Sequence, residues 1–233
     1  MDFTERHVLV TGGTGTLGAS VVAALIEAGA TCHVPSRGGA TPRGAALRGH
    51  PRLELVPAAD LSDERAVAAV FSALPSLWAS IHLAGAFAYA PIGETDGDTL
   101  RRQIDSNFLS CFLCCRAAVA AMRHGGAGGR IVNVASRPGI EWRAGANMTA
   151  YAASKAAVAA LTVALAEEVV ADGILVNAVA PAIFDTPANR AAMPKADVAQ
   201  WPTPDDVART ILFLASPANT ATRGAVVPVY GKS

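Results

Sequence analysis

Short, largely apolar runs alternate with longer alanine-rich segments along almost the whole chain, and this pattern restricts the fold more than any other feature. The runs have the length of strands and span residues 7–11, 31–37, 53–57, 79–84, 130–135, 174–180 and part of 224–231. The segments between them have a helical period, which predicts helices at 16–29, 62–73, 99–124, 149–172 and 204–215. Strands that are apolar at consecutive positions are covered on both faces, so repeated βαβ units predict an α/β fold with a doubly wound parallel sheet.

The composition is consistent with one domain of this kind. The chain has 233 residues, of which 52% are hydrophobic and 16% charged, so residues 1–233 can bury both faces of one sheet. Nineteen basic and nineteen acidic side chains give a net charge of zero. A chain without excess positive charge does not attract nucleic acid or anionic membranes, so we expect neither as a partner.

The N-terminal sequence MDFTERHVLV leads directly into an expected strand, without the basic and long apolar regions of a secretory signal. The longest apolar stretches are interrupted before the roughly 20 residues that cross a bilayer. We therefore expect a soluble, cytoplasmic protein without a membrane partner.

Gly13, Gly15 and Gly18 form a GxGxxG motif directly after the first expected strand and at the start of the first helix. There, glycines permit a tight turn and let the backbone approach a pyrophosphate, which N–H groups at the helix N-terminus stabilise. The motif predicts a Rossmann fold that binds a dinucleotide; the alternative is an ordinary glycine-rich turn. The residues expected at the phosphates are Thr11, Gly12, Gly13, Gly15, Thr16, Leu17 and Gly18.

The residues at the end of the second expected strand favour NADP(H) over NAD(H). An acidic residue about 20 positions after the glycines usually binds the adenosine ribose of NAD. No acidic residue lies between Glu27 and Glu54, whereas Ser36 and Arg37 end the strand. Arginine can form a charge-assisted pair with a 2′-phosphate, although surface solvation is the alternative role for this arginine.

Tyr151 and Lys155 are four residues apart on an expected helix, so their side chains point in one direction. A nearby ammonium stabilises a phenolate and lowers the pKa of a tyrosine, which suits Tyr151 to proton transfer. Ser136 follows an expected strand, and its hydroxyl is placed to polarise a substrate oxygen opposite Tyr151.

With these motifs, the chain resembles the short-chain dehydrogenase/reductase family from residue 7 to residue 231. The resemblance implies catalysis by Ser136, Tyr151 and Lys155, with Asn107 supporting a proton relay through water. It implies an NADP(H)-dependent carbonyl reductase or alcohol dehydrogenase that acts on a small ketone, aldehyde or 3-oxoacyl substrate. The remaining cofactor contacts that it implies are Asp60, Leu61, Ala84, Gly85, Pro181 and Thr186.

The chain departs from the family pattern in four places. His82 replaces an asparagine, Ala182 replaces a glycine, and Thr16 stands where the commonest short members have glycine. The spacing from Ser136 to Tyr151 is about two residues longer than usual, owing to an insertion in RPGIEWRAGANM. A displacement of Ser136 by this insertion would remove its role.

Residues 182–203 contain three prolines and predict a loop or short helices over the strand ends, where a substrate enters. Phe184, Met193 and Trp201 offer apolar contact there, and Asn189 and Arg190 offer polar contact. The helices at 99–124 and 149–172 are alanine-rich beyond one core stripe, and the family resemblance implies a homodimer or homotetramer that pairs through them.

Cys111, Cys114 and Cys115 crowd together on one expected helix, but the sequence shows no second pair of metal ligands, so we expect buried thiols and no metal. Two other functions remain open. One is a non-catalytic NADP-binding regulator or scaffold that retains the fold. The other is an epimerase or dehydratase on the same fold, although such enzymes usually have a larger C-terminal region.

Overall fold

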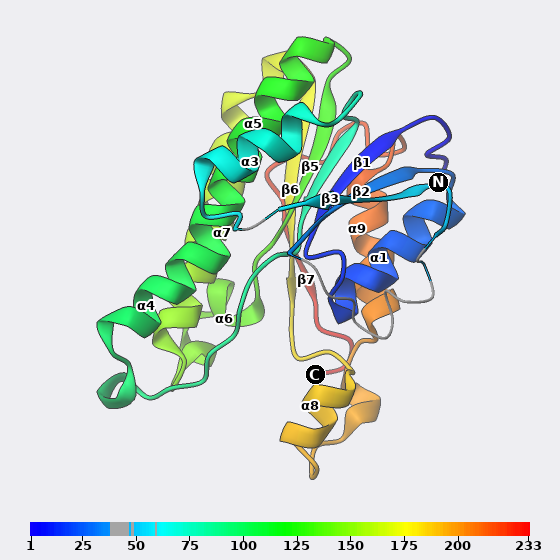
Figure 1. Cartoon of the computed structure of the whole chain (residues 1–233). Coiled ribbons are helices and arrows are strands. Elements are labelled where there is room, and N and C mark those ends of the chain that lie inside the picture. Colours follow the sequence, from blue (N-terminus) through cyan, green and yellow to red (C-terminus); the bar gives the residue numbers. More distant parts are fainter. Residues whose placement is uncertain (38–46, 48, 59) are drawn as a thin grey trace.

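The computed structural model describes residues 1–37, 47, 49–58 and 60–233, and within them seven parallel strands form one sheet (Figure 1). The strand order is β3-β2-β1-β4-β5-β6-β7. The chain crosses from one half of the sheet to the other between β3 and β4, so the strand order reverses next to β1, as in a doubly wound Rossmann fold. The expected fold class is confirmed. The strands are β1 His7–Thr11, β2 Thr31–Ser36, β3 Leu53–Pro57, β4 Ala79–His82, β5 Gly129–Val134, β6 Ile174–Pro181 and β7 Val226–Val229.

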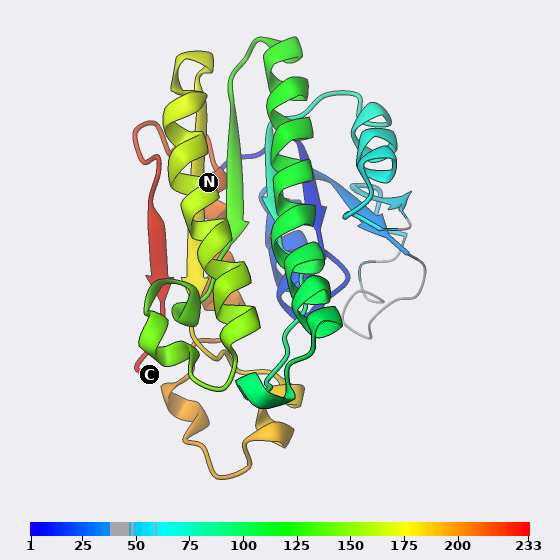
Figure 2. The ribbon, with the colours of Figure 1, turned by 90° about the vertical axis from the view of Figure 1, so that its left-hand side faces the viewer.

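Helices cover both faces of this sheet. Helices α1 (Thr16–Glu27) and α9 (Pro204–Ala215) lie on one face. On the other face lie α3 (Glu64–Ser72), α5 (Ser110–Gly125) and α7 (Thr149–Glu168), and Figure 2 shows α5 and α7 side by side in front of the strands. Three short helices extend beyond the carboxyl ends of the strands: α4 Gly97–Gln103, α6 Arg137–Ile140 and α8 Pro187–Ala192.

Each face of the sheet has its own apolar core. Val8 and Val10 of β1 pack in the cluster beneath α1 and α9, whereas Leu9 between them packs in the cluster beneath α3, α5 and α7. All three side chains are fully buried. Because successive side chains of a strand point to opposite faces, this two-sided burial accounts for the consecutive apolar residues in the sequence.

The expected helix at 99–124 is longer and less regular than its period indicates. It consists of α4, a π-helical turn at Ile104–Leu109 and α5. The expected helix at 149–172 ends at Glu168 and is followed by a separate 3-10 turn at Val170–Asp172. Residues 182–203 form α8 and a 3-10 turn, as expected of a loop with short helices.

Two helical stretches, Gly97–Gly125 and Thr149–Glu168, are long and apolar enough to span a membrane by length and composition. The expectation that all apolar stretches fall short of that length is therefore wrong for these two. Both stretches pack against the sheet and bury core residues such as Leu113 and Val158. A core helix passes the same test of length and hydropathy, so the test says little about a membrane here.

Candidate active site

The glycine turn joins β1 to α1 at the carboxyl edge of the sheet. Gly12 has a φ of +66°, and a Cβ atom there would lie 2.8 Å from the backbone nitrogen of Ala84. A Cβ atom on Gly18 would lie 2.1 Å from the carbonyl oxygen of Gly12. Backbone atoms leave no room for a side chain at either position. Only glycine therefore lets the start of α1 lie this close to β1 and to the segment after β4.

The first turn of α1 carries neither an acidic residue nor a side-chain hydrogen bond at its N-cap, Gly15. Unlike α3, which Asp63 caps by accepting from two backbone N–H groups, α1 leaves its positive end for another acceptor. This end of the helix fits the pyrophosphate of a dinucleotide.

The expected adenosine residues lie at one edge of the sheet. Ser36 ends β2 and Arg37 follows it, exposed. Asp60 accepts a hydrogen bond from the backbone of Ser62 at 2.9 Å, which lowers the pKa of its carboxyl group, and the charge of Arg37 contributes to the same lowering. Arg37 therefore lies near enough to Asp60 for the two charges to interact. Leu61 packs against the core beneath α3 and α5.

Ser136, Tyr151 and Lys155 lie together in spite of the longer spacing between the first two. A hydrogen bond from Ser136 to the Tyr151 phenol opposes the rise in its pKa that burial causes. The segment that contains the expected insertion folds into α6 and a 3-10 turn at Trp142–Gly145, which lie against α7. This close contact requires glycine at two positions. A Cβ atom on Gly139 would lie only 2.8 Å from Lys155, and one on Gly145 only 2.7 Å from Ala152.

The Lys155 ammonium group, one turn after Tyr151 on α7, donates a hydrogen bond to the carbonyl oxygen of Val134 at 2.7 Å. Burial lowers the pKa of Lys155 to about 8, with a smaller opposing effect of Cys111. Burial raises the pKa of Tyr151. The lowering of the Tyr151 pKa that the sequence predicted is therefore wrong for this structure, because desolvation of the phenolate outweighs the hydrogen bond from Ser136.

Asn107 lies in the π-helical turn and joins three segments of the site. Its Nδ2 donates to the carbonyl oxygen of Ala86 at 2.9 Å and to Ser154 Oγ at 3.0 Å, and its Oδ1 accepts from the backbone N–H of Ala86 at 2.9 Å. A Cβ atom on Gly85 would lie 2.4 Å from Asn107 Oδ1 and 3.6 Å from Lys155 Nζ. Only glycine fits there, and the loop after β4 lies directly against Asn107 and Lys155.

Comparison with known proteins identifies this arrangement. The family model described as "short chain dehydrogenase" matches residues 6–197. A cis-4-hydroxycyclohexanecarboxylate dehydrogenase of Sinomonas cyclohexanicum is 35% identical over 98% of this chain and 96% of its own. A 3beta-hydroxysteroid dehydrogenase of Mediterraneibacter gnavus is 32% identical over 98% of this chain and 95% of its own.

The chain belongs to the short-chain dehydrogenase family. A solved short-chain type dehydrogenase/reductase from Mycobacterium ulcerans superposes with a TM-score of 0.87 at 27% identity, covering 100% of this chain and 90% of that one. The family resemblance expected from the sequence is thus confirmed, and with it a seven-stranded oxidoreductase fold.

One aromatic residue of this short-chain dehydrogenase site was missed in the sequence. Phe87, two residues after Gly85, packs edge-on against the Tyr151 ring, with centroids 5.0 Å apart and planes at 84°. Its side chain is 62% exposed, so it lies on the open side of Tyr151. No local pattern marks it, because the contact depends on how the loop after β4 crosses the start of α7.

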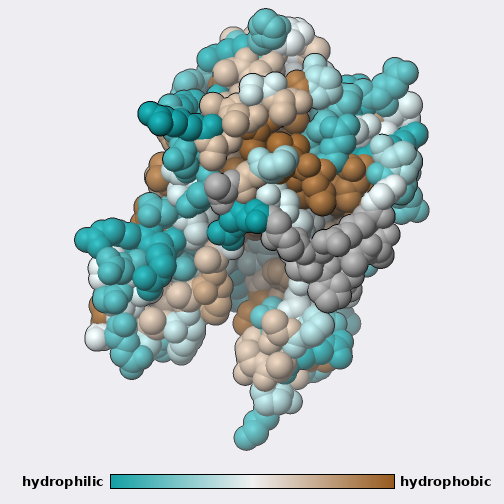
Figure 3. All heavy atoms as spheres, viewed as in Figure 1, coloured by the Kyte–Doolittle hydropathy of each residue, from teal (hydrophilic) through white to brown (hydrophobic). Residues whose placement is uncertain are grey.

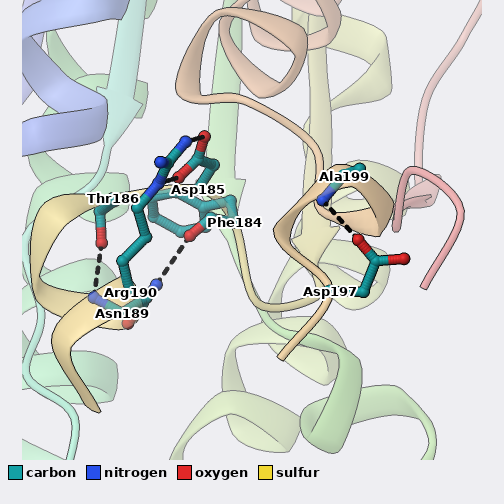
Figure 4. A network of polar contacts seen from close by, with 7 residues as sticks. All are labelled: Phe184, Asp185, Thr186, Asn189, Arg190, Asp197 and Ala199. Carbon is teal, nitrogen blue, oxygen red and sulfur yellow. Dashed lines mark hydrogen bonds and ion pairs between the residues drawn. The ribbon is translucent and has the colours of Figure 1, made fainter. Parts of the chain in front are cut away.

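The expected substrate segment, residues 182–203, uses most of its polar groups internally (Figure 4). Arg190 forms a two-pronged ion pair with Asp185 at 2.5 and 2.7 Å, and Asn189 Nδ2 donates to the carbonyl oxygen of Phe184 at 2.8 Å. Asn189 and Arg190 are thus engaged within the segment, and their polar contact to a substrate stays a prediction. Thr186 caps α8 by accepting from the Asn189 N–H, and Pro181 ends the buried β6.

The molecular surface is hollowed beside this segment. Figure 3 shows a recess between the part that carries α4 and α6 and the part that carries α8. Because α4, α6 and α8 lie beyond the carboxyl ends of the strands, the recess opens at the edge of the sheet that carries the candidate site.

Proposed function

We propose that this chain is an NADP(H)-dependent oxidoreductase that interconverts a carbonyl and an alcohol, with Tyr151 as the acid/base. The observation that supports this most strongly is the hydrogen bond between Ser136 and Tyr151, one turn of α7 from the buried Lys155. These three groups lie beside the glycine turn on the carboxyl edge of the sheet, where doubly wound folds bind nucleotides.

In the reductive direction, Tyr151 gives its proton to the substrate oxygen while the Ser136 hydroxyl holds that oxygen. NADPH, when bound, supplies the hydride. The carbonyl of Val134 holds the Lys155 ammonium group, and its charge would favour the phenolate that remains on Tyr151 after proton transfer. Asn107 positions the loop of Gly85 and Ala86 beside Lys155 and would support proton exchange through water.

The residues present fit a dinucleotide. The uncapped start of α1 would hold the pyrophosphate, and the backbone of Thr11, Gly12, Gly13, Gly15, Thr16, Leu17 and Gly18 would surround it. Ala84 and Gly85 would contact the ribose next to the nicotinamide, and Pro181 and Thr186 would contact its carboxamide. Asp60 and Leu61 would contact the adenine.

The preference for NADP(H) rests on Ser36 and Arg37. Arg37 is exposed at the end of β2, and its charge interacts with Asp60 across the expected adenosine site. A 2′-phosphate bound there would pair with the guanidinium group.

The substrate would be a small secondary alcohol or the corresponding carbonyl compound, entering beside 182–203. Because Arg190 is paired with Asp185 and Asn189 with a carbonyl, apolar contacts such as Phe87 would dominate its recognition. The relatives named for hydroxycyclohexanecarboxylate and for a hydroxysteroid act on ring alcohols, so cyclic ketones are the first compounds to test.

A homodimer or homotetramer through α5 and α7 fits the exposed side of this helix pair. Val163 on α7 is 46% exposed and Phe112 on α5 is 40% exposed, although both are apolar. Burial of such a surface by a second copy stabilises an oligomer, and light scattering on the purified protein would measure its mass.

The deciding experiment follows NADPH oxidation with 4-oxocyclohexanecarboxylate, a 3-oxosteroid and a 3-oxoacyl thioester. Tyr151→Phe should lose turnover by at least about a thousandfold and retain NADPH binding, since general acid catalysis contributes up to ~10⁴-fold. Tyr89→Phe is the matched control, because Tyr89 is a 61% exposed tyrosine outside this group. Equal turnover by Tyr151→Phe and the control would contradict the assignment, and NADPH binding without any Tyr151-dependent turnover would favour a regulator.

A further inference from the structure

A second cluster of reactive side chains lies buried beneath the candidate active site. His82 at the end of β4 and Cys111 and Cys115 on α5 bring their ligand atoms within 4.8 Å of one another. Asn133 on β5 completes the group. All four side chains are at most 5% exposed, and the proposed oxidoreductase reaction uses none of them.

The amide oxygen of Asn133 lies at the centre of this cluster. It is 2.8 Å from His82 Nδ1, 3.3 Å from Cys111 Sγ and 3.4 Å from Cys115 Sγ. The orientation of the amide follows from its other end, where Nδ2 donates to Thr162 Oγ1, which itself donates to the carbonyl of Val158. The oxygen, and not the nitrogen, therefore faces the three ligand atoms.

Without a metal, this cluster has more donors than acceptors. Two thiols and one imidazole N–H point at a single amide oxygen, which has two lone pairs. These three buried donors therefore compete for one amide oxygen. A cation that replaces the thiol protons would remove this excess.

The distances are those of a small tetrahedral site. With Zn–S near 2.3 Å and Zn–N or Zn–O near 2.1 Å, tetrahedral geometry places sulfur about 3.6 Å from nitrogen or oxygen. The two sulfur–nitrogen distances are 4.0 and 3.5 Å, and the two sulfur–oxygen distances are 3.3 and 3.4 Å. The nitrogen–oxygen distance, 2.8 Å, would have to widen by roughly half an ångström.

The remaining ring nitrogen of His82 is also arranged as in metal sites. Nε2 lies 2.8 Å from Ser80 Oγ, so the imidazole can keep its proton there and present Nδ1 as a ligand. A ligating histidine usually donates its other N–H in this way, which fixes the tautomer and the ring orientation.

We propose that His82, Cys111, Cys115 and Asn133 form a structural site for a thiophilic divalent cation, with Zn²⁺ as the fitting ion. Binding releases the two thiol protons, so the cation and two thiolates carry no net charge in the core. The ion would join β4, β5 and α5 directly beneath the catalytic group, since Asn133 precedes Val134, the carbonyl that holds Lys155. This site does not depend on the proposed oxidoreductase function.

The test is the metal content of the full chain expressed in zinc-supplemented medium and purified without chelator. We expect about one Zn per chain in the natural protein and at most about a tenth of that in Cys111→Ser/Cys115→Ser. The matched control is Cys114→Ser, because Cys114 is a buried thiol on the same helix outside the cluster and should leave the Zn content unchanged. His82→Asn introduces the family's usual residue at this position and should lower the Zn content without unfolding the chain.

Expression with Co²⁺ in place of Zn²⁺ gives a second measurement. A thiolate-bound Co²⁺ should show an intense near-ultraviolet charge-transfer band in the natural protein and in Cys114→Ser, but not in the double variant. Zn content in the natural protein no higher than in a folded His82→Asn variant, or Co²⁺ without the charge-transfer band, would overturn the proposal.

Discussion

Asn107 holds Ala86 by both ends of one amide: its Oδ1 accepts from the Ala86 N–H and its Nδ2 donates to the Ala86 carbonyl, each at 2.9 Å. Such a pair of hydrogen bonds fixes the path of a loop as a neighbouring strand would. The loop in question carries Gly85 and Phe87, which contact Lys155 and Tyr151. Asn107 therefore shapes the site without having to touch the substrate.

Replacement of Asn107 by leucine should destabilise the protein by about 1–3 kcal/mol, because both hydrogen bonds to Ala86 and the one to Ser154 are lost. Turnover should fall as well, since the loop beside Lys155 is released. Urea unfolding and steady-state kinetics would measure the two effects. Ser106→Ala, which removes one exposed hydroxyl in the same turn, should change stability by less than about 0.5 kcal/mol; a similar loss in both variants would refute this role of Asn107.

Replacement of Arg37 by alanine should weaken NADPH binding roughly ten- to a hundredfold, the value of a charge-assisted pair with phosphate. NADH binding should change by less than about threefold, because NADH has no 2′-phosphate. Fluorescence titration with each cofactor would measure both constants. Arg65→Ala provides an exposed arginine on α3 as the control. Equal weakening of NADPH and NADH would show that Arg37 does not recognise the phosphate.

Gly18→Ala should prevent cofactor binding and lower stability by about 1–3 kcal/mol, because its Cβ would lie 2.1 Å from the Gly12 carbonyl oxygen. The last residue of α5 offers a matched glycine. A Cβ atom on Gly125 meets nothing within 4 Å, so Gly125→Ala should be neutral or stabilise by up to about 1 kcal/mol. Thermal unfolding of both variants would test the contrast, and similar melting temperatures would contradict it.

The buried Lys155 should make stability depend on pH. Its pKa is about 8 in the folded chain and 10.5 when exposed, so above pH 8 the unfolded chain binds more protons. Stability should therefore rise between about pH 8 and 10.5, by roughly 3 kcal/mol from this group. Urea midpoints of the natural protein and of Lys155→Met would show the effect as a difference in slope between pH 7 and 10. Parallel curves would mean that Lys155 keeps its ordinary pKa when folded.

The sequence predicts the sheet well because its evidence is local. Each signal involves residues that are close together in the sequence: the strand and helix periods, the glycine motif and the Tyr151–Lys155 spacing. The structure places the strands and main helices near their predicted bounds. The π-helical turn at Ile104–Leu109 was not predicted, because hydrophobic period does not distinguish it from an α-helix.

The contacts that were missed join residues far apart in the sequence. Cys111 lies 29 residues from His82 and 22 from Asn133, so the cysteine-rich stretch of the sequence showed only half of a possible metal site. The ion pair of Arg190 with Asp185 depends on how the chain bends into α8. Burial reversed the expected direction for the pKa of Tyr151, and burial is a property of the packed molecule.

The π-helical turn also limits how this region can vary. Each residue added to or removed from an α-helix rotates everything beyond it by about 100°. Asn107 within the turn is hydrogen-bonded to Ala86, while Cys111 and Cys115 beyond the turn face β4 and β5. The wider π turn at Ile104–Leu109 sets the phase of α5 relative to α4. A regular α-helix of the same number of residues would swing these thiols and the apolar stripe of α5 away from the sheet, so the π geometry of this segment is under as strict a constraint as its composition.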